Sequence, residues 1–287
     1  MNKISAGWVN GFIGVVIFAG SLPATRVAVM DFDPVFLTAV RATIPALIGA
    51  IVLIAFKQKV PDKQYLASVV VTALGVVVGF PLLSALALQH ITSAHAIVFL
   101  GILPLLTAIF AVWLGDKRPP MMFWLFAFAG SAFVAGFAAL SEGHSSMLGG
   151  LFMLGAVVTC ALGYAEGAKL TKEFGGWQVI SWSLIVSLPI MLPLAIFTRP
   201  ESVANVSMTG WIGLGYVSLF SMFIGFIFWY KGLAQGGIAA VGQLQLLQPF
   251  MGLMLASLLL HETISLSMIV STLGAIVCVA GAKKYAV

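Results

Sequence analysis

Charged residues are scarce in this sequence. Asp, Glu, Lys and Arg make up 8% of the 287 residues, and only nine residues are acidic. Intrinsic disorder requires many charges and few apolar residues, so this composition excludes a disordered chain. The net charge of +5 comes from basic residues scattered between apolar runs. It therefore does not indicate a nucleic-acid-binding surface.

Cysteines and the common catalytic motifs are nearly absent. The two cysteines, Cys160 and Cys278, lie inside apolar runs without a Cys-x-x-Cys spacing, so neither a disulfide framework nor a thiolate metal site is predicted. The sequence has no His-Glu-x-x-His motif, no paired intramembrane aspartates and no Ser/His dyad on one helix face. The sequence therefore shows no set of catalytic residues that an intramembrane enzyme would need. No cofactor, metal or catalytic residue is predicted.

Apolar residues are what the sequence has in excess. They account for 61% of the chain, with a mean hydropathy of +1.11, which indicates a bilayer as the solvent. The first apolar run follows one lysine and lacks a clear small-x-small cleavage site, which favours a retained helix over a signal peptide. Ten runs are long enough to span a bilayer as helices, namely residues 7–28, 34–56, 64–88, 93–114, 119–140, 148–170, 176–197, 207–231, 238–260 and 264–282.

The basic residues divide unequally between the two sides of these spans. One side receives only Arg26 and Arg199, and Arg41 lies inside the second span. By the positive-inside rule, the richer side is cytoplasmic. The sequence therefore predicts a multi-pass protein of the cell inner (plasma) membrane with both termini in the cytoplasm. The richer side receives eleven of the fourteen basic residues: Lys3, Lys57, Lys59, Lys63, Lys117, Arg118, Lys169, Lys172, Lys231, Lys283 and Lys284.

A weak internal repeat divides the chain into two halves. Pro104 pairs with Pro249 at an offset of 145 residues (249 − 104), and "VAG" at 134–136 recurs at 279–281 with the same offset. We expect a first five-helix repeat at residues 1–142 and a second at 143–287. Five is odd, so the second repeat should enter the membrane inverted. Secondary transporters share this arrangement and bind substrate between the repeats, near mid-membrane.

Two stretches carry a resemblance to a known family. They are "TSAHAIVFLGILPLLTAIFAVWLGDKRP" at 92–119 and its echo ending "LLLHETIS". Each has a proline within the helix and an acidic residue after it, Asp116 and Glu262. The whole chain resembles the drug/metabolite transporter superfamily in its ten-helix EamA-type branch, although His261 stands where that family often has glycine. Within the superfamily, the chain is most similar to bacterial exporters of aromatic amino acids. The resemblance implies a cavity among helices 1, 3, 4, 6, 8 and 9.

Three glutamines lie near the midpoint of the ninth expected span. An unpaired amide is costly in hydrocarbon, so Gln243, Gln245 and Gln248 should face protein or a wet cavity. Gln245 and Gln248 are about 60° apart around an α-helix and share a face. They are candidate substrate-binding residues, with interhelical hydrogen bonding as the alternative role. Pro249 and Pro104 each predict a kink that could act as a gating hinge.

Four further residues are candidates for substrate binding, each with an ordinary alternative. His95 opens the fourth span and could pair with a substrate carboxylate or titrate, or could simply lie at the interface. Phe80 and Ser84 occupy the third span and could face the cavity. Trp229, in the eighth span, could close the inner mouth of a pathway, although an interfacial tryptophan belt is commoner.

Two charged residues within spans, Arg41 and Glu166, have further possible roles. Arg41 sits about 10 Å into its helix, and we expect it to snorkel outward toward Asp31 or Asp33, with a substrate-carboxylate role as the minority alternative. Glu166 lies one turn from Lys169, and an intrahelical ion pair is the ordinary expectation. Glu166 and His95 are the only candidates for a proton relay.

Stripes of small residues predict close contacts between helices. Gly7, Gly11, Gly14, Phe18, Ser21 and Thr25 form a stripe in the first span, Gly155, Thr159 and Gly163 form one in the sixth, and Ser218, Ser221, Gly225 and Trp229 form one in the eighth.

Together the patterns predict an all-α membrane protein that transports small metabolites, amino acids including aromatic ones, by alternating access, with export the favoured direction. The alternatives are a multidrug or other metabolite exporter of the same fold and, behind these, a channel or lipid flippase. The expected partners are a small-molecule substrate and the lipid bilayer, with no nucleic acid and no obligatory protein partner.

Overall fold

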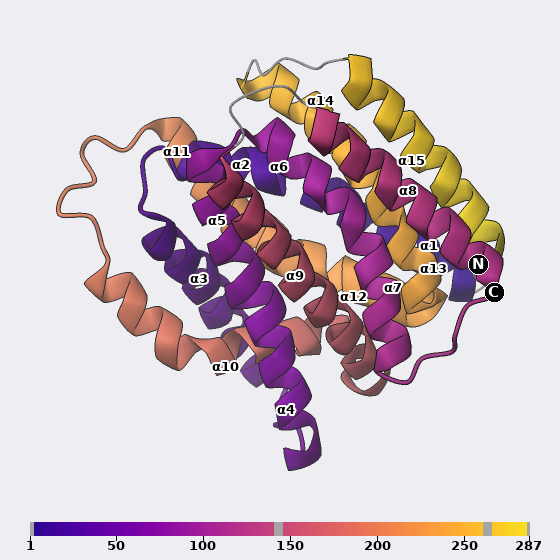
Figure 1. Cartoon of the computed structure of the whole chain (residues 1–287). Coiled ribbons are helices and arrows are strands. Elements are labelled where there is room, and N and C mark those ends of the chain that lie inside the picture. The colour runs from indigo at the N-terminus through magenta and orange to yellow at the C-terminus, as the bar shows by residue number, and fades with distance from the viewer. Residues whose placement is uncertain (1–2, 141–145, 261–265, 286–287) are drawn as a thin grey trace.

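The computed structural model describes residues 3–140, 146–260 and 266–285, and every regular element in those ranges is helical (Figure 1). The expected boundary between repeats, at residues 142 and 143, lies outside the described residues. So do His261 and Glu262, on which part of the family resemblance depends.

The first repeat contains five helical runs, several of them divided. These runs are α1 (Lys3–Ala19) with α2 (Ser21–Ala28); α3 (Pro34–Ala55); α4 (Lys63–Thr72), η1 (Ala73–Gly79) and α5 (Phe80–His90); α6 (Ser93–Phe99), η2 (Leu100–Ile102) and α7 (Leu103–Trp113); and α8 (Met121–Leu140).

The second repeat follows the same plan. Its runs are α9 (Met147–Phe174); α10 (Gly176–Phe197); α11 (Met208–Gly215), η3 (Tyr216–Ile224) and α12 (Gly225–Gly236); α13 (Ile238–Gly242), η4 (Gln243–Leu247) and α14 (Gln248–Leu260); and α15 (Leu266–Tyr285).

In the described part of the chain, eight runs are long and apolar enough to cross a bilayer, judged by length and composition. The other two expected spans are α8 and α15, whose described apolar stretches, Met121–Phe133 and Ile269–Ala282, are shorter. The chain is thus an all-helical, multi-pass membrane protein, and the runs start and end within a few residues of the sequence-based expectation.

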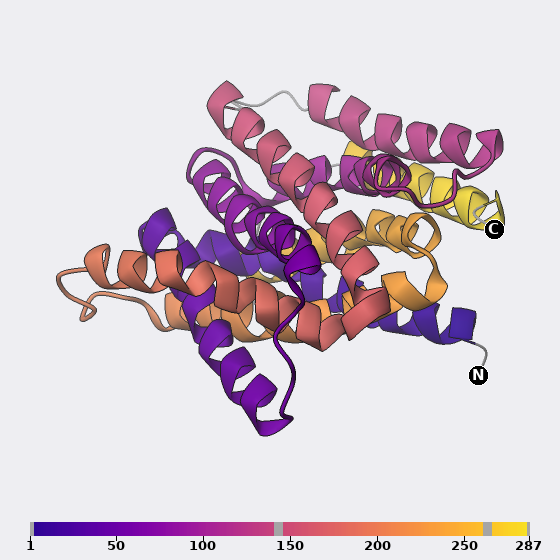
Figure 2. The same cartoon turned by 90° about the horizontal axis from the view of Figure 1, so that it is seen from below.

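The two repeats are inverted relative to each other. The ring of Phe56, just after α3, lies 5.8 Å from that of Trp177 at the start of α10. Likewise Phe126, near the start of α8, lies 5.8 Å from Tyr285 at the end of α15, and these two helices run side by side in both views (Figures 1 and 2). Each pair joins equivalent helices of the two repeats, and each pair is antiparallel.

The backbone departs from α-helical geometry in four runs, at equivalent places in the repeats. The third and eighth runs contain the π-helical segments η1 and η3, and the fourth and ninth contain the 3-10 segments η2 and η4. Pro104 and Pro249 are each the second residue after the end of a 3-10 segment. Proline lacks a backbone N–H and crowds the carbonyl four residues earlier, which accounts for the break in α-geometry there.

Glycines bring helix backbones together, as the stripes predicted for the first and sixth spans; in the eighth span the contact is made by Gly232 and Gly236, which lie outside its predicted stripe. A Cβ on Gly232 would lie 2.5 Å from the backbone nitrogen of Gly11, and one on Gly7 would lie 2.5 Å from that of Gly236. α1 and α12 therefore touch backbone to backbone, a contact that larger residues would prevent. At the equivalent contact between the repeats, that of the third and sixth spans, a Cβ on Gly75 would lie 2.6 Å from the carbonyl oxygen of Thr159.

Candidate functional site

A small cavity lies at the centre of the bundle, between the repeats. Its volume is about 10 Å³, room for about one water molecule. It lies among the six spans that the family resemblance implied, and the second span joins them through Arg41. The lining residues are Phe18, Ser21, Arg41, Val76, Phe80, Leu100, Leu103, Tyr164, Ser221, Phe226 and Gln248.

Each of the four irregular runs contributes to this cavity. Val76 comes from η1, Leu100 from η2 and Ser221 from η3, while Gln248 directly follows η4. Irregular turns within helices often mark hinges and functional sites. The places where the backbone leaves α-geometry thus converge on this central cavity.

Arg41 is the most unusual residue in the cavity. The prediction that it snorkels toward Asp31 or Asp33 is wrong, because the side chain is 2% exposed and turns inward. Asp31 instead accepts hydrogen bonds from Ser207, and Asp33 caps the start of α3. Three hydroxyls surround Arg41: Nη2 donates to Ser221 (3.1 Å) and Ser21 (3.3 Å), and Nη1 to Thr25 (3.5 Å).

Among the described residues, the positive charge of Arg41 has no counter-ion. No described carboxylate lies within 4.0 Å of the guanidinium. Its Nε–H has no hydrogen-bond partner. An arginine deep in a span costs roughly 3 kcal/mol on insertion scales, so the fold retains a costly and only partly satisfied charge at its centre.

The glutamines lie in different surroundings, although all three are buried. Gln248 lines the cavity; its Nε2 donates to the Phe18 carbonyl (3.3 Å), and its Oε1 has no partner. Gln245 lies near the Tyr164 phenol without a well-formed hydrogen bond. Gln243 is 0% exposed, and neither side-chain polar atom has a partner. The 3-10 segment η4 nearly eclipses residues three apart, so Gln245 and Gln248 share one side of the helix.

Of the other candidates, only Phe80 lines the cavity. The Ser84 hydroxyl donates to the carbonyl of Pro81 in its own helix (3.2 Å). His95 is half-buried at the start of α6, with its ring 5.9 Å from that of Phe99. Trp229 is 0% exposed, so the belt alternative does not apply to it; its ring lies 5.4 Å from that of Tyr164.

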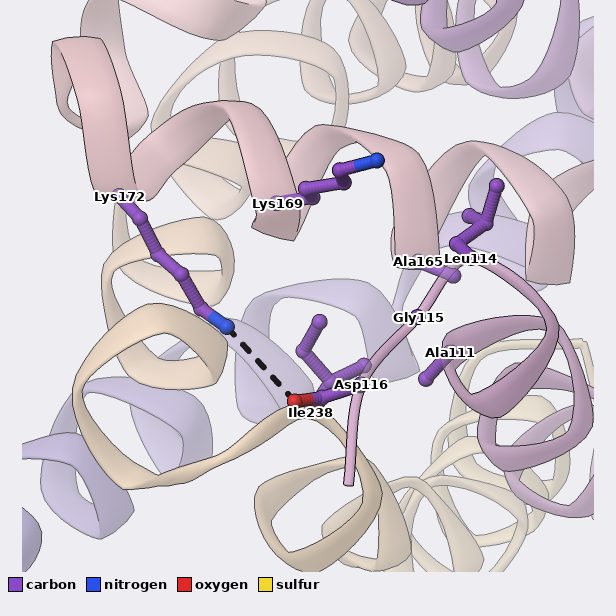
Figure 3. A pocket seen from close by; sticks show the side chains of 8 residues that line it. All are labelled: Ala111, Leu114, Gly115, Asp116, Ala165, Lys169, Lys172 and Ile238. Carbon is purple, nitrogen blue, oxygen red and sulfur yellow. Dashed lines mark ion pairs between the residues drawn. The ribbon is translucent and has the colours of Figure 1, made fainter. Parts of the chain in front are cut away.

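A second cavity opens at the end that the charge pattern predicts to be cytoplasmic (Figure 3). Its volume is about 130 Å³, and the ends of α7 and α9 and the start of α13 line it. Lys172 Nζ lies 3.8 Å from Asp116 Oδ1 across this cavity. Asp116, which the sequence marked as the acidic residue after the fourth span, thus ties that span to the sixth.

The expected pair between Glu166 and Lys169 does not form. Lys169 turns into the end cavity, whereas Glu166 is 6% exposed and its Oε2 has no hydrogen-bond partner. Ala165, Lys169 and Lys172 share one side of α9 at helical spacing and face α7, so Glu166, one residue on from Ala165, points about 100° away.

Sequence reasoning left several cavity residues without a role. Ser21, Ser221 and Phe18 appeared only as members of helix-contact stripes, and Tyr164 and Phe226 carried no signal. Arg41 was conspicuous as the one basic residue deep within a span, and this was the available signal. Its inward direction depends on hydroxyls from α2 and η3, which are about 200 residues apart in sequence (221 − 21 = 200).

Two inverted five-helix repeats around a central polar cavity define a membrane transporter fold. The chain belongs to the EamA-like transporter family, which it matches twice, over residues 5–139 and 147–282. It is 59% identical over 286 residues to the uncharacterized transporter YdeK of Bacillus subtilis (strain 168), with 100% of both chains covered.

More distant relatives agree with this assignment. The uncharacterized transporter YvbV of the same organism is 25% identical over 264 residues, which cover 90% of this chain and 85% of YvbV. One solved crystal structure superposes with a TM-score of 0.76 at 17% identity, covering 99% of each chain. That likeness supports the fold.

Proposed function

We propose that this transporter moves amino acids, including aromatic ones, out of the cytoplasm by alternating access through the central cavity. The observation that carries the proposal is the pairing of a free donor and a free acceptor in one cavity. Arg41 offers unpaired N–H groups, and Gln248 offers an unpaired Oε1. An amino acid brings a carboxylate for the first and an ammonium for the second.

The apolar part of the lining suits an aromatic or aliphatic side chain. Phe18 lies with its ring 5.0 Å from that of Phe226 and 6.2 Å from that of Tyr164. Small-molecule sites combine such apolar walls with a few placed polar groups. The cavity thus carries both parts of an amino-acid site.

Alternating access explains why so small a cavity can serve a transporter. A volume of about 10 Å³ is far below the ~300 Å³ of typical ligand pockets, so the cavity must widen in another conformation to hold an amino acid. In the proposed cycle, η2 and η4, with Pro104 and Pro249, act as hinges that open the site to one side or the other. A substrate drives this exchange only through different affinities for the two conformations.

In this proposal the chain works in the plasma membrane with both termini cytoplasmic. It needs no obligatory protein partner, since one chain contains the whole pathway, and no catalysed reaction is assigned to it. Gln245, Gln243, His95, Ser84 and Trp229 then act around the site, as the sequence suggested, in conformations more open than the described one.

Transport in proteoliposomes tests the proposal. Purified protein should support saturable flux of labelled phenylalanine, tyrosine or leucine above empty liposomes. Absence of flux for every amino acid would contradict the proposal, and flux that never saturates would indicate a channel. Flux of lipophilic cations without competition from amino acids would assign the chain to drug export instead.

A further inference from the structure

We propose that Arg41, held by Ser21, Thr25 and Ser221, is the anion-binding group of this transporter, and that it selects substrates carrying a carboxylate beside an apolar group. This inference rests on the proposed function and names the feature by which the site would recognise its substrate. It concerns one residue in the centre of the fold that an interhelical contact alone would not require.

The first argument is electrostatic. A guanidinium has five N–H donors, whereas three hydrogen bonds to neutral hydroxyls are formed, at 3.1–3.5 Å, and Nε has no partner. A buried charge is normally paired, yet no described carboxylate is within 4.0 Å. No described group of the protein therefore neutralises the charge of Arg41. We infer that an anion from outside the protein can do so by binding in the cavity beside Arg41.

The second argument comes from the repeat. Pro45 in α3 matches Pro189 in α10 at an offset of 144 residues (189 − 45), and the same offset places Ile185 opposite Arg41. The position equivalent to Arg41 in the second repeat is therefore occupied by an isoleucine. The architecture does not need a charge at this point, so its presence in one repeat calls for a role other than folding.

The third argument is how the hydroxyls are oriented. Thr25 Oγ1 donates to the Ser21 carbonyl (2.7 Å), and the Ser21 and Ser221 hydroxyls lie 2.9 Å apart. These bonds fix the hydroxyls so that they hold two Nη atoms of Arg41. The planar fork of arginine suits a carboxylate, and fixing it beforehand lowers the entropy cost of binding.

Binding of matched probes to purified protein tests the inference. The probes are 3-phenylpropionate, indole-3-propionate and hexanoate, which have a carboxylate and no amine, and 2-phenylethylamine, which has the amine only. Wild-type protein should bind a carboxylate probe at least tenfold more tightly than 2-phenylethylamine. Arg41→Gln should weaken carboxylate binding about tenfold to hundredfold, the range expected for hydrogen bonds to a charged group, and Arg41→Lys should weaken it less.

Arg26→Gln is the matched control. Arg26 is half-buried in α2 and donates to the Leu88 carbonyl, outside the cavity, so carboxylate affinity should stay within twofold of wild type. All affinities are measured on protein that elutes as a single species in detergent. Failure of every carboxylate to bind, tighter binding of 2-phenylethylamine, or unchanged carboxylate affinity in Arg41→Gln would each overturn the inference.

These results separate this inference from the proposed function. Arg41-dependent carboxylate binding without amino-acid flux would leave the anion site standing and remove the amino-acid assignment. Amino-acid flux that Arg41→Gln leaves unchanged would do the reverse, and Arg41 would then be a structural link between α2, α3 and η3.

Discussion

Two regions of the molecule hold positive charge in opposite ways. In the central cavity, Arg41 is 2% exposed, and its hydrogen bonds go to hydroxyl groups. At the predicted cytoplasmic end, the side chain of Lys172 is 47% exposed and lies 3.8 Å from Asp116, which is 30% exposed. At the end region the charge of Lys172 is exposed and paired, whereas the charge of Arg41 at the centre is buried and has no ion-pair partner among the described residues.

The difference in burial and pairing suits the two regions to different roles in the proposed transport cycle. An exposed ion pair contributes only about 0.2–1 kcal/mol, so the Asp116–Lys172 contact can break and re-form at little cost. A buried unpaired charge costs several times more, and such a residue persists where a ligand compensates for it. The end pair is therefore suited to closing a passage, and the central arginine to binding what passes.

The largest expected effect is that of charge reversal at the two places. Arg41→Glu puts an anion where the substrate carboxylate would lie, and it should reduce phenylalanine flux in proteoliposomes by at least about a hundredfold. Lys172→Glu disrupts only an exposed pair and should keep flux within about fivefold of wild type. Flux is normalised to folded protein; equal losses in both variants would remove the distinction between the regions.

Replacing one amide in each region should have an intermediate and selective effect. Gln248→Leu removes the cavity acceptor proposed for the substrate ammonium, so it should weaken phenylalanine binding about tenfold and leave 3-phenylpropionate within about twofold. Gln178→Leu removes a hydrogen bond to Gln58 at the end region (3.4 Å) and should change neither affinity. Calorimetric titration of both ligands measures the ratio, and parallel losses for the two ligands would contradict the assigned role of Gln248.

Opening of the end cavity should respond modestly to loss of its ion pair. With Leu114→Cys as a half-buried reporter in the cavity lining, Asp116→Asn should raise the rate of labelling by a membrane-impermeant maleimide about 1.4- to 5-fold, since an exposed pair contributes ~0.2–1 kcal/mol. Cys160 and Cys278 are buried and give a low background. Exchanging the charges, Asp116→Lys with Lys172→Asp, should restore the slower rate; no restoration would mean that the pair does not hold this end closed.

The smallest expected effect is that of salt. At about 1 M salt the Debye length falls to about 3 Å, and exposed pairs are screened more than buried ones. The labelling difference caused by Asp116→Asn should therefore disappear, while the affinity ratio between wild type and Arg41→Gln for 3-phenylpropionate should persist within about twofold. A ratio that vanishes with salt would place Arg41 in contact with bulk solvent during binding.

Sequence reasoning was most accurate where the physics is local. The span expected at 176–197 is α10, Gly176–Phe197, and that expected at 34–56 is α3, Pro34–Ala55, because bilayer thickness fixes how long an apolar run must be. The small-residue stripe of the first span correctly predicted a close helix contact, although not that its partner is α12, since close backbone approach needs residues without bulk. Pro104 and Pro249 correctly marked breaks in helix geometry.

Sequence reasoning was wrong where the contacts of a side chain depend on residues far away in the sequence. Arg41 was expected to follow the nearest carboxylates in sequence, but Asp33 was occupied in capping α3. For Trp229, placed at the end of the eighth expected span, an interfacial belt was the alternative to a substrate-binding role, yet α12 continues to Gly236 and buries the ring. The π-helical segments η1 and η3 had no sequence signal that would have placed them.

By itself, the sequence determined the spans, their alternation, the repeat and the sidedness of the basic residues, because each depends on run length, composition and order along one chain. Only the tertiary structure decided that the charge of Arg41 lies beside the hydroxyls of Ser21 and Ser221 and the free oxygen of Gln248. Those groups come from both repeats, and inversion brings them to one cavity. The rotation of each helix about its axis and its depth in the membrane decide which buried polar groups meet in the cavity. The sequence of a single span specifies neither.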